Sequence, residues 1–296
     1  MRLAGGNLAL MNWWESVVLG IVQGLTEFLP ISSSAHIRVV GPLMPGVGDP
    51  GAAYTAIIQI GTEAAVLMFF RKDIVRIIGA WINALRGRDG ADRRSRLGAQ
   101  NADARLGWWI IVGSVPIVAL GLLFQNAIEN NLRNLYITVV TLTVFGLVLA
   151  WADRIGTKRR DLGQLRGRDA VWLGLAQAGA LIPGVSRSGG TISMGLLLGL
   201  TREAAARYSF LLAIPAVLGS GLYQAASGYD EIAATGGPGW GNTILAAVIA
   251  FAVGYLVIVW FLKLITTHSF MPFVIYRIGF AGVIVALLTT GTVAAT

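Results

Sequence analysis

The chain has 296 residues, of which 55% are hydrophobic and 13% are charged, whereas about a quarter of the residues in a soluble domain are charged. This composition excludes an ordinary water-soluble domain, and the absence of cysteine excludes disulfides and cysteine metal sites. The formal net charge of +8 does not indicate nucleic-acid binding, because the basic residues lie in short stretches between apolar segments and not on one amphipathic face.

The N-terminal segment does not have the pattern of a cleaved signal peptide. Its only basic residue is Arg2, and Glu15, Gln23 and Glu27 interrupt its apolar stretch. We therefore expect this segment to stay in the protein. Met11 is a candidate for the natural start, in which case the first ten residues are an extension without function.

Two early segments are too polar or too short to cross a membrane. Trp13–Leu29 carries two glutamates and is ended by Pro30, and His36–Leu43 has about half of the roughly 20 residues that a span requires. We predict a helix, a loop and a second helix that returns to the starting side. Such a loop is tolerated at membrane depth only where protein or a water-filled cavity surrounds it.

Six further segments are apolar over about the length of a bilayer-spanning helix. The predicted fold is an all-α polytopic membrane protein with six transmembrane helices and two re-entrant helix-loop-helix segments. The six predicted spans are Ala52–Phe70, Trp108–Phe124, Leu135–Trp151, Tyr208–Ala226, Ile244–Leu262 and Ile278–Ala295.

The distribution of basic residues predicts how the chain is oriented. Arg71–Arg105 holds nine Lys and Arg residues and Arg154–Arg168 holds six, so the positive-inside rule places both in the cytoplasm, together with Lys263–Arg277. Asn126–Asn134 has one arginine and Gln224–Asn242 has none. These two segments and the uncharged C-terminal tail are expected outside.

The two halves of the chain resemble each other at an offset of about 154 residues. Gly20–Ser33 matches Gly174–Ser186, and Tyr54–Ile60 matches Tyr208–Ile214. Each half then holds a broken segment and three spans, and because three is odd, the halves run in opposite directions. We predict an inverted-topology repeat in a single domain, with halves at about 12–152 and 169–292 and a basic cytoplasmic linker at 153–168; such broken segments commonly meet near the midplane at a ligand site.

The first broken segment carries a carboxylate and an amide on one helix face. Gln23 and Glu27 are four residues apart, so both side chains can converge on a cation or on a metal-bound phosphate. A purely structural interpretation makes Glu27 an interhelical polar group. A carboxylate inside a bilayer nevertheless favours a functional role.

The loop that follows adds hydroxyls and the only histidine within a motif. Its serines can bind phosphate oxygens or supply a nucleophile, and His36 can act as a base or an acid near neutral pH. Alternatively the serines cap a helix and His36 is a core residue. The serines are Ser32, Ser33 and Ser34.

The second broken segment has the composition of an anion site. Its glycines let backbone N–H groups approach an anion, and the helix that it opens adds partial positive charge at its N-terminus. Arg187 supplies a planar fork for phosphate oxygens. An ordinary re-entrant turn would explain the small residues but not the arginine. The neighbouring candidates are Ser186, Ser188, Gly189 and Thr191.

Together, Gln23–His36 and Pro183–Thr191 resemble the two hallmark motifs of the bacitracin-resistance type of undecaprenyl-diphosphate phosphatase. The resemblance covers the whole chain in length, hydropathy and motif spacing. It implies a multi-pass enzyme of the bacterial cell membrane that hydrolyses C55 polyprenyl diphosphate to the monophosphate and inorganic phosphate, which recycles the lipid carrier of cell-wall synthesis. It also implies a divalent cation, Mg²⁺ or Ca²⁺.

The resemblance assigns roles to individual residues. It implies catalytic roles for Glu27, Ser33, His36 and Arg187. Gln23 occupies a position that is Glu or Gln in the family, so here the metal site of Glu27 and Gln23 has one negative charge fewer and Gln23 can act only as a neutral ligand or hydrogen-bond partner. The expected substrate-binding residues are Gln23, Ser32, Ser34, Ser186, Ser188, Gly189 and Thr191.

Several points stay open at the level of sequence. The nucleophile is Ser33 assisted by His36 or, alternatively, a water activated by Glu27 or His36. Glu63, inside a predicted span, is either a hydrogen-bonded structural group or part of the same cavity. The expected partners are the polyprenyl diphosphate lipid and the bilayer, without nucleic acid, and a homodimer is compatible with the sequence.

The main alternative function is a secondary transporter or a polyprenyl-phosphate flippase, because inverted repeats with broken helices are the usual architecture of transporters. Release of inorganic phosphate from a prenyl diphosphate distinguishes the two classes. If the protein is an enzyme, its active site is expected to face the outer side of the membrane, because the first broken segment, which carries Glu27 and His36, enters from outside.

Overall fold

The computed structural model describes residues 11–44, 50–124, 128, 132–234 and 237–295. The proposed N-terminal extension and most of the expected outer segment 126–134 lie outside this part. Over the described ranges the chain forms helices and no strand, with one isolated β-bridge between Arg160 and Leu200. The predicted all-α class is therefore confirmed.

The six predicted spans are confirmed as helices long and apolar enough to cross a membrane. Their boundaries differ least from the sequence prediction at the first span and most at the last, because polar residues at a helix end lower the hydropathy without ending the helix. The spans are α3 (Gly51–Phe69), α6 (Ala102–Leu123), α8 (Leu135–Ile155), α11 (Arg202–Ser227), α13 (Trp240–Thr267) and α14 (Met271–Thr289).

The start of α14 differs from the sequence prediction at Arg277. The sequence predicts a cytoplasmic stretch Lys263–Arg277, yet Arg277 lies inside α14 and is fully buried. A hydropathy profile treats an arginine as the end of a span, because it cannot show that the guanidinium finds hydrogen-bond acceptors in the interior. The basic stretch 71–105 also differs from a simple loop, since it forms α4 (Arg71–Leu85) and the short α5 (Arg93–Arg96).

Two pairs of shorter helices carry the sequence motifs. In each pair the helices pack against each other, and a loop that contains a proline separates them. The pairs are α1 (Trp13–Thr26) with α2 (Ser33–Leu43), and α9 (Gly167–Ala178) with α10 (Arg187–Leu197). The remaining short elements are α12 (Tyr229–Ala233) and the 3-10 helices η2 (Leu162–Gln164) and η3 (Gly179–Leu181).

The two loops share an unusual backbone conformation. Ser32 precedes α2 with a φ of 73°, and Ser186 precedes α10 with a φ of 71°. A non-glycine residue with positive φ costs on the order of 1–3 kcal/mol and persists only where its surroundings enforce it. The same exception therefore recurs at the offset that the sequence repeat predicts.

The packing of α1 and α9 repeats in the same way. α1 packs on α13, and α9 packs on α6. Both contacts depend on a glycine: a Cβ at Gly20 would lie 2.6 Å from the Ala246 carbonyl oxygen, and a Cβ at Gly174 would lie 2.4 Å from the Gly113 carbonyl oxygen. In both cases the first helix of one half packs on a span of the other half, as expected for two related halves. That the halves run in opposite directions through a membrane stays a prediction.

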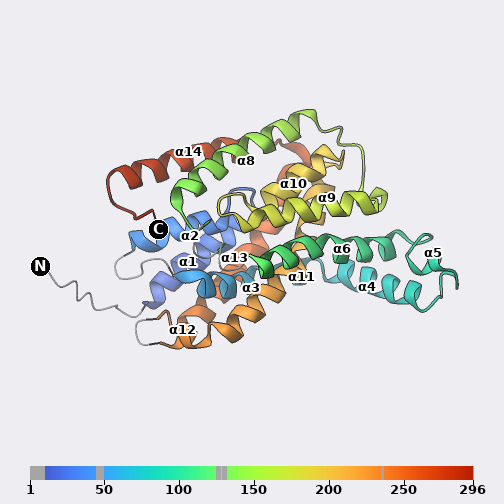
Figure 1. Ribbon diagram of the computed structural model, residues 1–296, viewed down its shortest axis with the longest axis horizontal. Coiled ribbons are helices and arrows are strands. Elements are labelled where there is room, and N and C mark those ends of the chain that lie inside the picture. The colour runs from blue at the N-terminus through green and yellow to red at the C-terminus, as the bar shows by residue number, and fades with distance from the viewer. Residues whose placement is uncertain (1–10, 45–49, 125–127, 129–131, 235–236, 296) are drawn as a thin grey trace, which may run out of the picture.

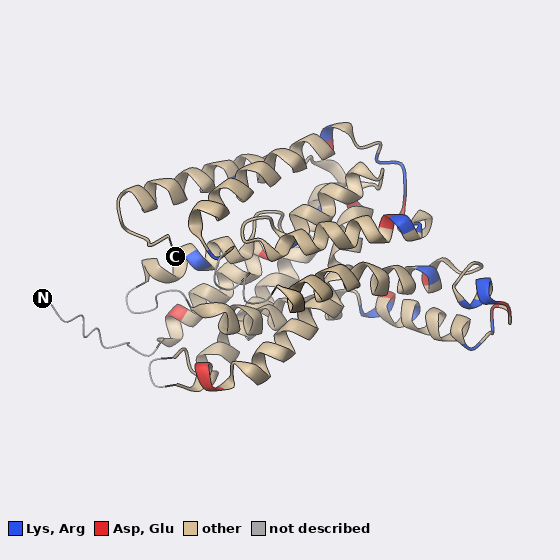
Figure 2. Cartoon of the chain, viewed as in Figure 1, with Lys and Arg blue, Asp and Glu red and all other residues tan. Residues whose placement is uncertain are grey.

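Charge is distributed unevenly along the long axis of the molecule. Most Lys and Arg residues lie at the end where α4, α5 and the connection from α8 to α9 are found, as Figure 2 shows on its right-hand side. The acidic residues Asp230 and Glu231 lie in α12 at the opposite end (Figures 1 and 2). The predicted cytoplasmic stretches Arg71–Arg105 and Arg154–Arg168 thus occupy one end, as a common cytoplasmic location requires.

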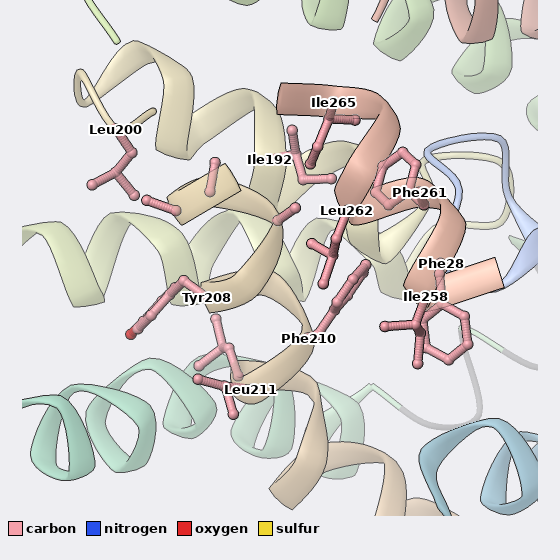
Figure 3. Close-up of a cluster of buried hydrophobic side chains, with 14 of the residues drawn as sticks. Phe28, Ile192, Leu200, Tyr208, Phe210, Leu211, Ile258, Phe261, Leu262 and Ile265 are labelled. Carbon is pink, nitrogen blue, oxygen red and sulfur yellow. The ribbon is translucent and has the colours of Figure 1, made fainter. Parts of the chain in front are cut away.

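A buried apolar cluster holds the first loop against the spans. Phe28 packs edge-on against Phe210 of α11, with ring centroids 5.2 Å apart. The cluster continues through Ile192 of α10 and through Ile258 and Phe261 of α13 (Figure 3). Apolar packing therefore brings the two motif-bearing regions to a common core, while large apolar side chains on the outer faces remain exposed, as contact with lipid requires.

Candidate active site

The carboxylate of Glu27 is the point at which the two motifs meet. Its Oε2 accepts hydrogen bonds from Gln23 Nε2 at 2.7 Å and from Ser33 Oγ at 2.5 Å. Its Oε1 accepts a hydrogen bond from Arg187 Nη2 at 2.6 Å. The predicted convergence of Glu27, Ser33 and Arg187 is thus present in the structure.

The position of Glu27 follows from how α1 ends. α1 begins with a cap in which the Glu15 carboxylate accepts the Asn12 N–H at 2.7 Å, and Glu27 is its C-cap. Glu27 therefore lies one helical turn after Gln23, at the point where the chain leaves the helix. The carboxylate points toward the loop that α1 leads into, where Ser33 opens α2.

The second motif divides into a residue that faces the first motif and residues that shape the loop. Ser186 Oγ accepts the Gly189 N–H at 3.2 Å, which caps α10. Ser188 Oγ donates to the Leu29 carbonyl at 3.0 Å and so ties α10 to the first loop. Thr191 Oγ1 donates to the Arg187 carbonyl at 2.7 Å and is fully buried. Gly189 and Thr191 therefore stabilise the helix start on which Arg187 is carried.

A cavity of about 570 Å³ opens beside this cluster. Its polar lining consists of Glu27, Arg187, Gln59, the hydroxyl-bearing residues Ser32, Ser33, Ser34 and Ser186, and Ser220, Tyr223 and Gln224 of α11. Its remaining walls come mainly from the C-terminal halves of α6 and α11 and are largely apolar, among them Ile117, Val118, Leu122, Ala216 and Val217. Of the predicted substrate-binding residues, Gln23, Ser188, Gly189 and Thr191 do not line it.

His36 faces away from the cavity, toward α14. Its Nδ1 is 2.7 Å from the Ser32 carbonyl oxygen, and its Nε2 is 2.8 Å from the Tyr276 hydroxyl. The imidazole stacks on Phe280 with ring centroids 4.0 Å apart. Both ring nitrogens are therefore engaged with groups other than Ser33, so the expected assistance of Ser33 by His36 has no hydrogen bond in this arrangement.

Glu63 lies close to the site but does not line the cavity. It is buried in α3, one turn after Gln59, and is near enough to Arg187 and Glu27 to interact with both charges. One of its oxygens has no hydrogen-bond partner among the described residues. Of the two interpretations from sequence, the cavity-lining one does not hold, because Glu63 is not in the cavity wall. The hydrogen-bonded one does not account for the oxygen without a partner.

The donor set fits a divalent cation only together with substrate. The described ranges contain no cluster of three or more His, Cys, Asp or Glu side chains that could hold a metal. Glu27 supplies one carboxylate, and the buried Oε1 of Gln23 has no hydrogen-bond partner in the described part of the chain. Mg²⁺ is often held by one or two carboxylates plus phosphate oxygens, so a lipid diphosphate could complete the coordination.

Sequence reasoning missed four residues around the site. Gln59 lines the cavity from a helix that reads as an apolar span. Tyr276, Arg277 and Phe280 reach the two loops or His36 from α14. The available signal was the pair Tyr276-Arg277 at the edge of a hydropathy peak, which is also the pattern of an ordinary span end.

Comparison with known proteins gives matches along nearly the whole chain. The family model described as "Bacitracin resistance protein BacA" matches residues 16–283. "Undecaprenyl-diphosphatase 2" of Agrobacterium fabrum is 61% identical over 286 residues, which cover 96% of this chain and 99% of the relative. "Undecaprenyl-diphosphatase" of Pseudarthrobacter chlorophenolicus is 56% identical, with 96% and 100% covered, and that of Bifidobacterium adolescentis is 53% identical, with 95% and 96% covered. The chain therefore belongs to the BacA family of bacitracin resistance proteins.

Proposed function

We propose that this protein is an undecaprenyl-diphosphate phosphatase, which converts the C55 lipid diphosphate to the monophosphate and inorganic phosphate. The names of the similar proteins support this substrate. The observation that carries the proposal is the convergence of Glu27, Ser33 and Arg187 at a cavity whose lining is otherwise largely apolar. A lipid diphosphate has the same division into a charged head and an apolar chain.

The cavity dimensions suit the head group and the beginning of the chain. Its volume of about 570 Å³ is within the range of roughly 300–1,000 Å³ that is usual for small-molecule sites, so a C55 chain must extend beyond it into the bilayer. The apolar walls from α6 and α11 would hold the first prenyl units. The diphosphate would then lie against Arg187 and the serines.

The hydrogen bond between Ser33 and Glu27 suggests the first chemical step. As Ser33 Oγ forms a bond to the terminal phosphorus, its proton passes to Glu27 Oε2, which already accepts that hydrogen bond at 2.5 Å. The bond from phosphorus to the bridging oxygen breaks, and the lipid monophosphate leaves with the bonding electrons. Attack of water on the phosphoserine then releases inorganic phosphate, with one water proton passing to Ser33 Oγ. The proton held by Glu27 leaves to the departing phosphate or to water, which restores the carboxylate.

Arg187 has a different task in this scheme. Phosphoryl transfer places negative charge on the equatorial and leaving oxygens, and a positioned guanidinium stabilises that charge. Arg187 is paired with Glu27 through Nη2, and a guanidinium has five N–H donors, so other donors of the same group would bind the diphosphate. Ser186, on the same loop and in the cavity wall, would donate to a phosphate oxygen.

A divalent cation, Mg²⁺ or Ca²⁺, would be held by Glu27 and the Gln23 amide oxygen and would neutralise part of the diphosphate charge.

We assign His36 a positioning role instead of the acid or base role expected from sequence. Its contacts with Tyr276 and Phe280 orient α2, which carries Ser33.

The proposed side of access follows from the charge distribution. α6 and α11 both begin at the basic end, and the cavity is lined by their C-terminal halves. If the basic end is cytoplasmic, the cavity opens toward the outer side of the bacterial cell membrane. The substrate would then enter from the outer leaflet.

The direct test is release of inorganic phosphate from a short-chain prenyl diphosphate by the purified full-length protein in detergent. We expect turnover with Mg²⁺ or Ca²⁺ and loss of turnover with a chelator. Ser33→Ala should abolish turnover if Ser33 is the nucleophile, whereas an activated water would leave measurable activity. A parent protein that releases no phosphate under any metal condition would instead favour a transporter or flippase.

A further inference from the structure

Arg277 is the largest fully buried side chain of the described part of the protein, at 0% exposure. It lies in α14, an otherwise largely apolar span. A guanidinium at such a position is expensive unless its donors are satisfied. The groups that accept hydrogen bonds from this guanidinium should therefore indicate its role.

All of the guanidinium contacts are with backbone carbonyl oxygens. Nε donates to Leu142 at 3.0 Å, and Nη1 donates to Pro30 at 3.0 Å and to Val185 at 3.2 Å. Nη2 donates to Gly184 at 2.8 Å, with longer contacts to Val185 at 3.2 Å and to Thr141 at 3.3 Å. No carboxylate of the described residues pairs with it.

These acceptors belong to both signature loops. Pro30 precedes Ser32 and Ser33 in the first loop, and Gly184 and Val185 precede Ser186 and Arg187 in the second. One rigid, planar group therefore joins the two loops, and neither Arg277 nor its acceptors line the cavity. The guanidinium also donates to the carbonyl oxygens of Leu142 and Thr141 in α8. Because these residues lie within a regular helix, they hold the guanidinium in place.

Two other polar links join the loops, and one of them must change during turnover. Ser188 Oγ donates to the Leu29 carbonyl, and Arg187 pairs with Glu27. In the proposed mechanism Glu27 takes up a proton and Arg187 binds the diphosphate, so the Glu27 link weakens during turnover. The contacts of Arg277 involve no cavity-lining atom, so they can persist throughout the reaction.

We infer that Arg277 is a positioning residue that holds the two signature loops at the spacing that catalysis requires. The inference rests on the proposed phosphatase function, because it concerns the relative placement of Ser33 and Arg187. A lysine cannot replace the group, since an ammonium has three donors and no planar fork to bridge two loops. A displacement of about 1 Å in such a site can lower the rate about a hundredfold.

The test combines kinetics with a distance measurement that does not depend on activity. The chain has no cysteine, so nitroxide labels can be attached at Leu25→Cys and Ile182→Cys, which are 46% and 36% exposed and lie beside the first and second loop. Pulsed electron paramagnetic resonance then reports the spacing of the two regions. Arg277→Gln and Arg277→Lys are compared in this background, and unlabelled variants are used for kcat and KM with a short-chain prenyl diphosphate.

Arg202→Gln is the matched control. Arg202 joins α11 to α8 through Asp153, with Nε 2.7 Å from the carboxylate, at the basic end away from the cavity. We expect Arg202→Gln to lower thermal stability without changing kcat or the distance distribution. Arg277→Gln should broaden the distribution and lower kcat about a hundredfold while KM changes less than about threefold. Arg277→Lys should give the same pattern to a smaller extent, and it carries the test if Arg277→Gln does not fold.

Two results would overturn the inference. An unchanged distance distribution in the Arg277 variants would show that this residue does not hold the loops. A broadened distribution with kcat within about threefold of the parent would show that their spacing does not matter for catalysis. If the parent itself releases no phosphate, the proposed function is wrong, and the distance distribution alone decides whether Arg277 links the loops.

Discussion

Replacing Glu27 by glutamine tests the central assignment with almost no change in shape. Ser33 and Arg187 donate to different oxygens of Glu27, so a glutamine, with one amide oxygen, can accept from only one of them. It also carries no charge and cannot take the serine proton. Loss of a general base typically lowers the rate by about 10²–10⁴, which corresponds to about 3–5 kcal/mol in the activation barrier. We therefore expect phosphate release to fall at least about a hundredfold.

The same substitution should also weaken the fold, which the sequence alone did not suggest. Sequence reasoning treats Glu27 as an isolated buried carboxylate, whose removal takes away a desolvation cost. In the structure it pairs with Arg187 at 2.6 Å, and the Arg187 side chain is only 16% exposed. Removing the charge leaves a cation that is poorly solvated, although the adjoining cavity can admit water. Exchanging charge-assisted hydrogen bonds for neutral ones should cost about 2 kcal/mol.

The measurement pairs phosphate release from a short-chain prenyl diphosphate with thermal unfolding in detergent. Glu15→Gln is the control, because Glu15 is a buried glutamate of the same helix that caps its start through Asn12 and lies outside the cavity. It should lower stability slightly and leave kcat unchanged. Activity of Glu27→Gln within about threefold of the parent, in folded protein, would refute the role of Glu27 as base and as metal ligand.

Three further predictions follow from the same geometry. Arg187→Lys should lower kcat/KM about a hundredfold to a thousandfold, or about 2.7–4 kcal/mol, as for loss of a single oxyanion donor; near-parental kinetics would argue against a diphosphate clamp. His36→Gln should reduce thermal stability and lower kcat only about tenfold, because the ring positions α2, and a loss as large as that of Glu27→Gln would restore a chemical role. In intact cells an impermeant maleimide should label Ser227→Cys but not Ala99→Cys, both of which are at exposed positions, and the reverse pattern would place the cavity on the cytoplasmic side.

The sequence predicted the fold to the extent that local composition determines it. Six apolar segments became six spans, because about 20 apolar residues suffice to specify a membrane-spanning helix. The ends were less predictable at α14 and at the stretch 71–105, which forms α4 and α5. Hydropathy does not register an amphipathic helix or a buried arginine whose donors are satisfied by distant carbonyls.

The candidate site was predictable where neighbours in sequence also meet in space. Gln23 and Glu27 share a helix face, and the motif that contains Arg187 was expected to reach the same place. The direction in which His36 points was not predictable, because Tyr276 and Phe280 lie some 240 residues away in the chain. The contribution of α14 depends on tertiary contacts that leave no periodic pattern in the sequence.

The recurring serine conformation has a consequence for how the two halves divide the work. Ser32 and Ser186 give the two loops the same backbone shape, yet the side chains that follow are not equivalent. In the proposed mechanism the N-terminal half contributes the proton acceptor Glu27 and the nucleophile Ser33, and the C-terminal half contributes the guanidinium of Arg187. On this mechanism neither half alone contains a complete set of reacting groups, so the two halves would act like the two different subunits of a heterodimer.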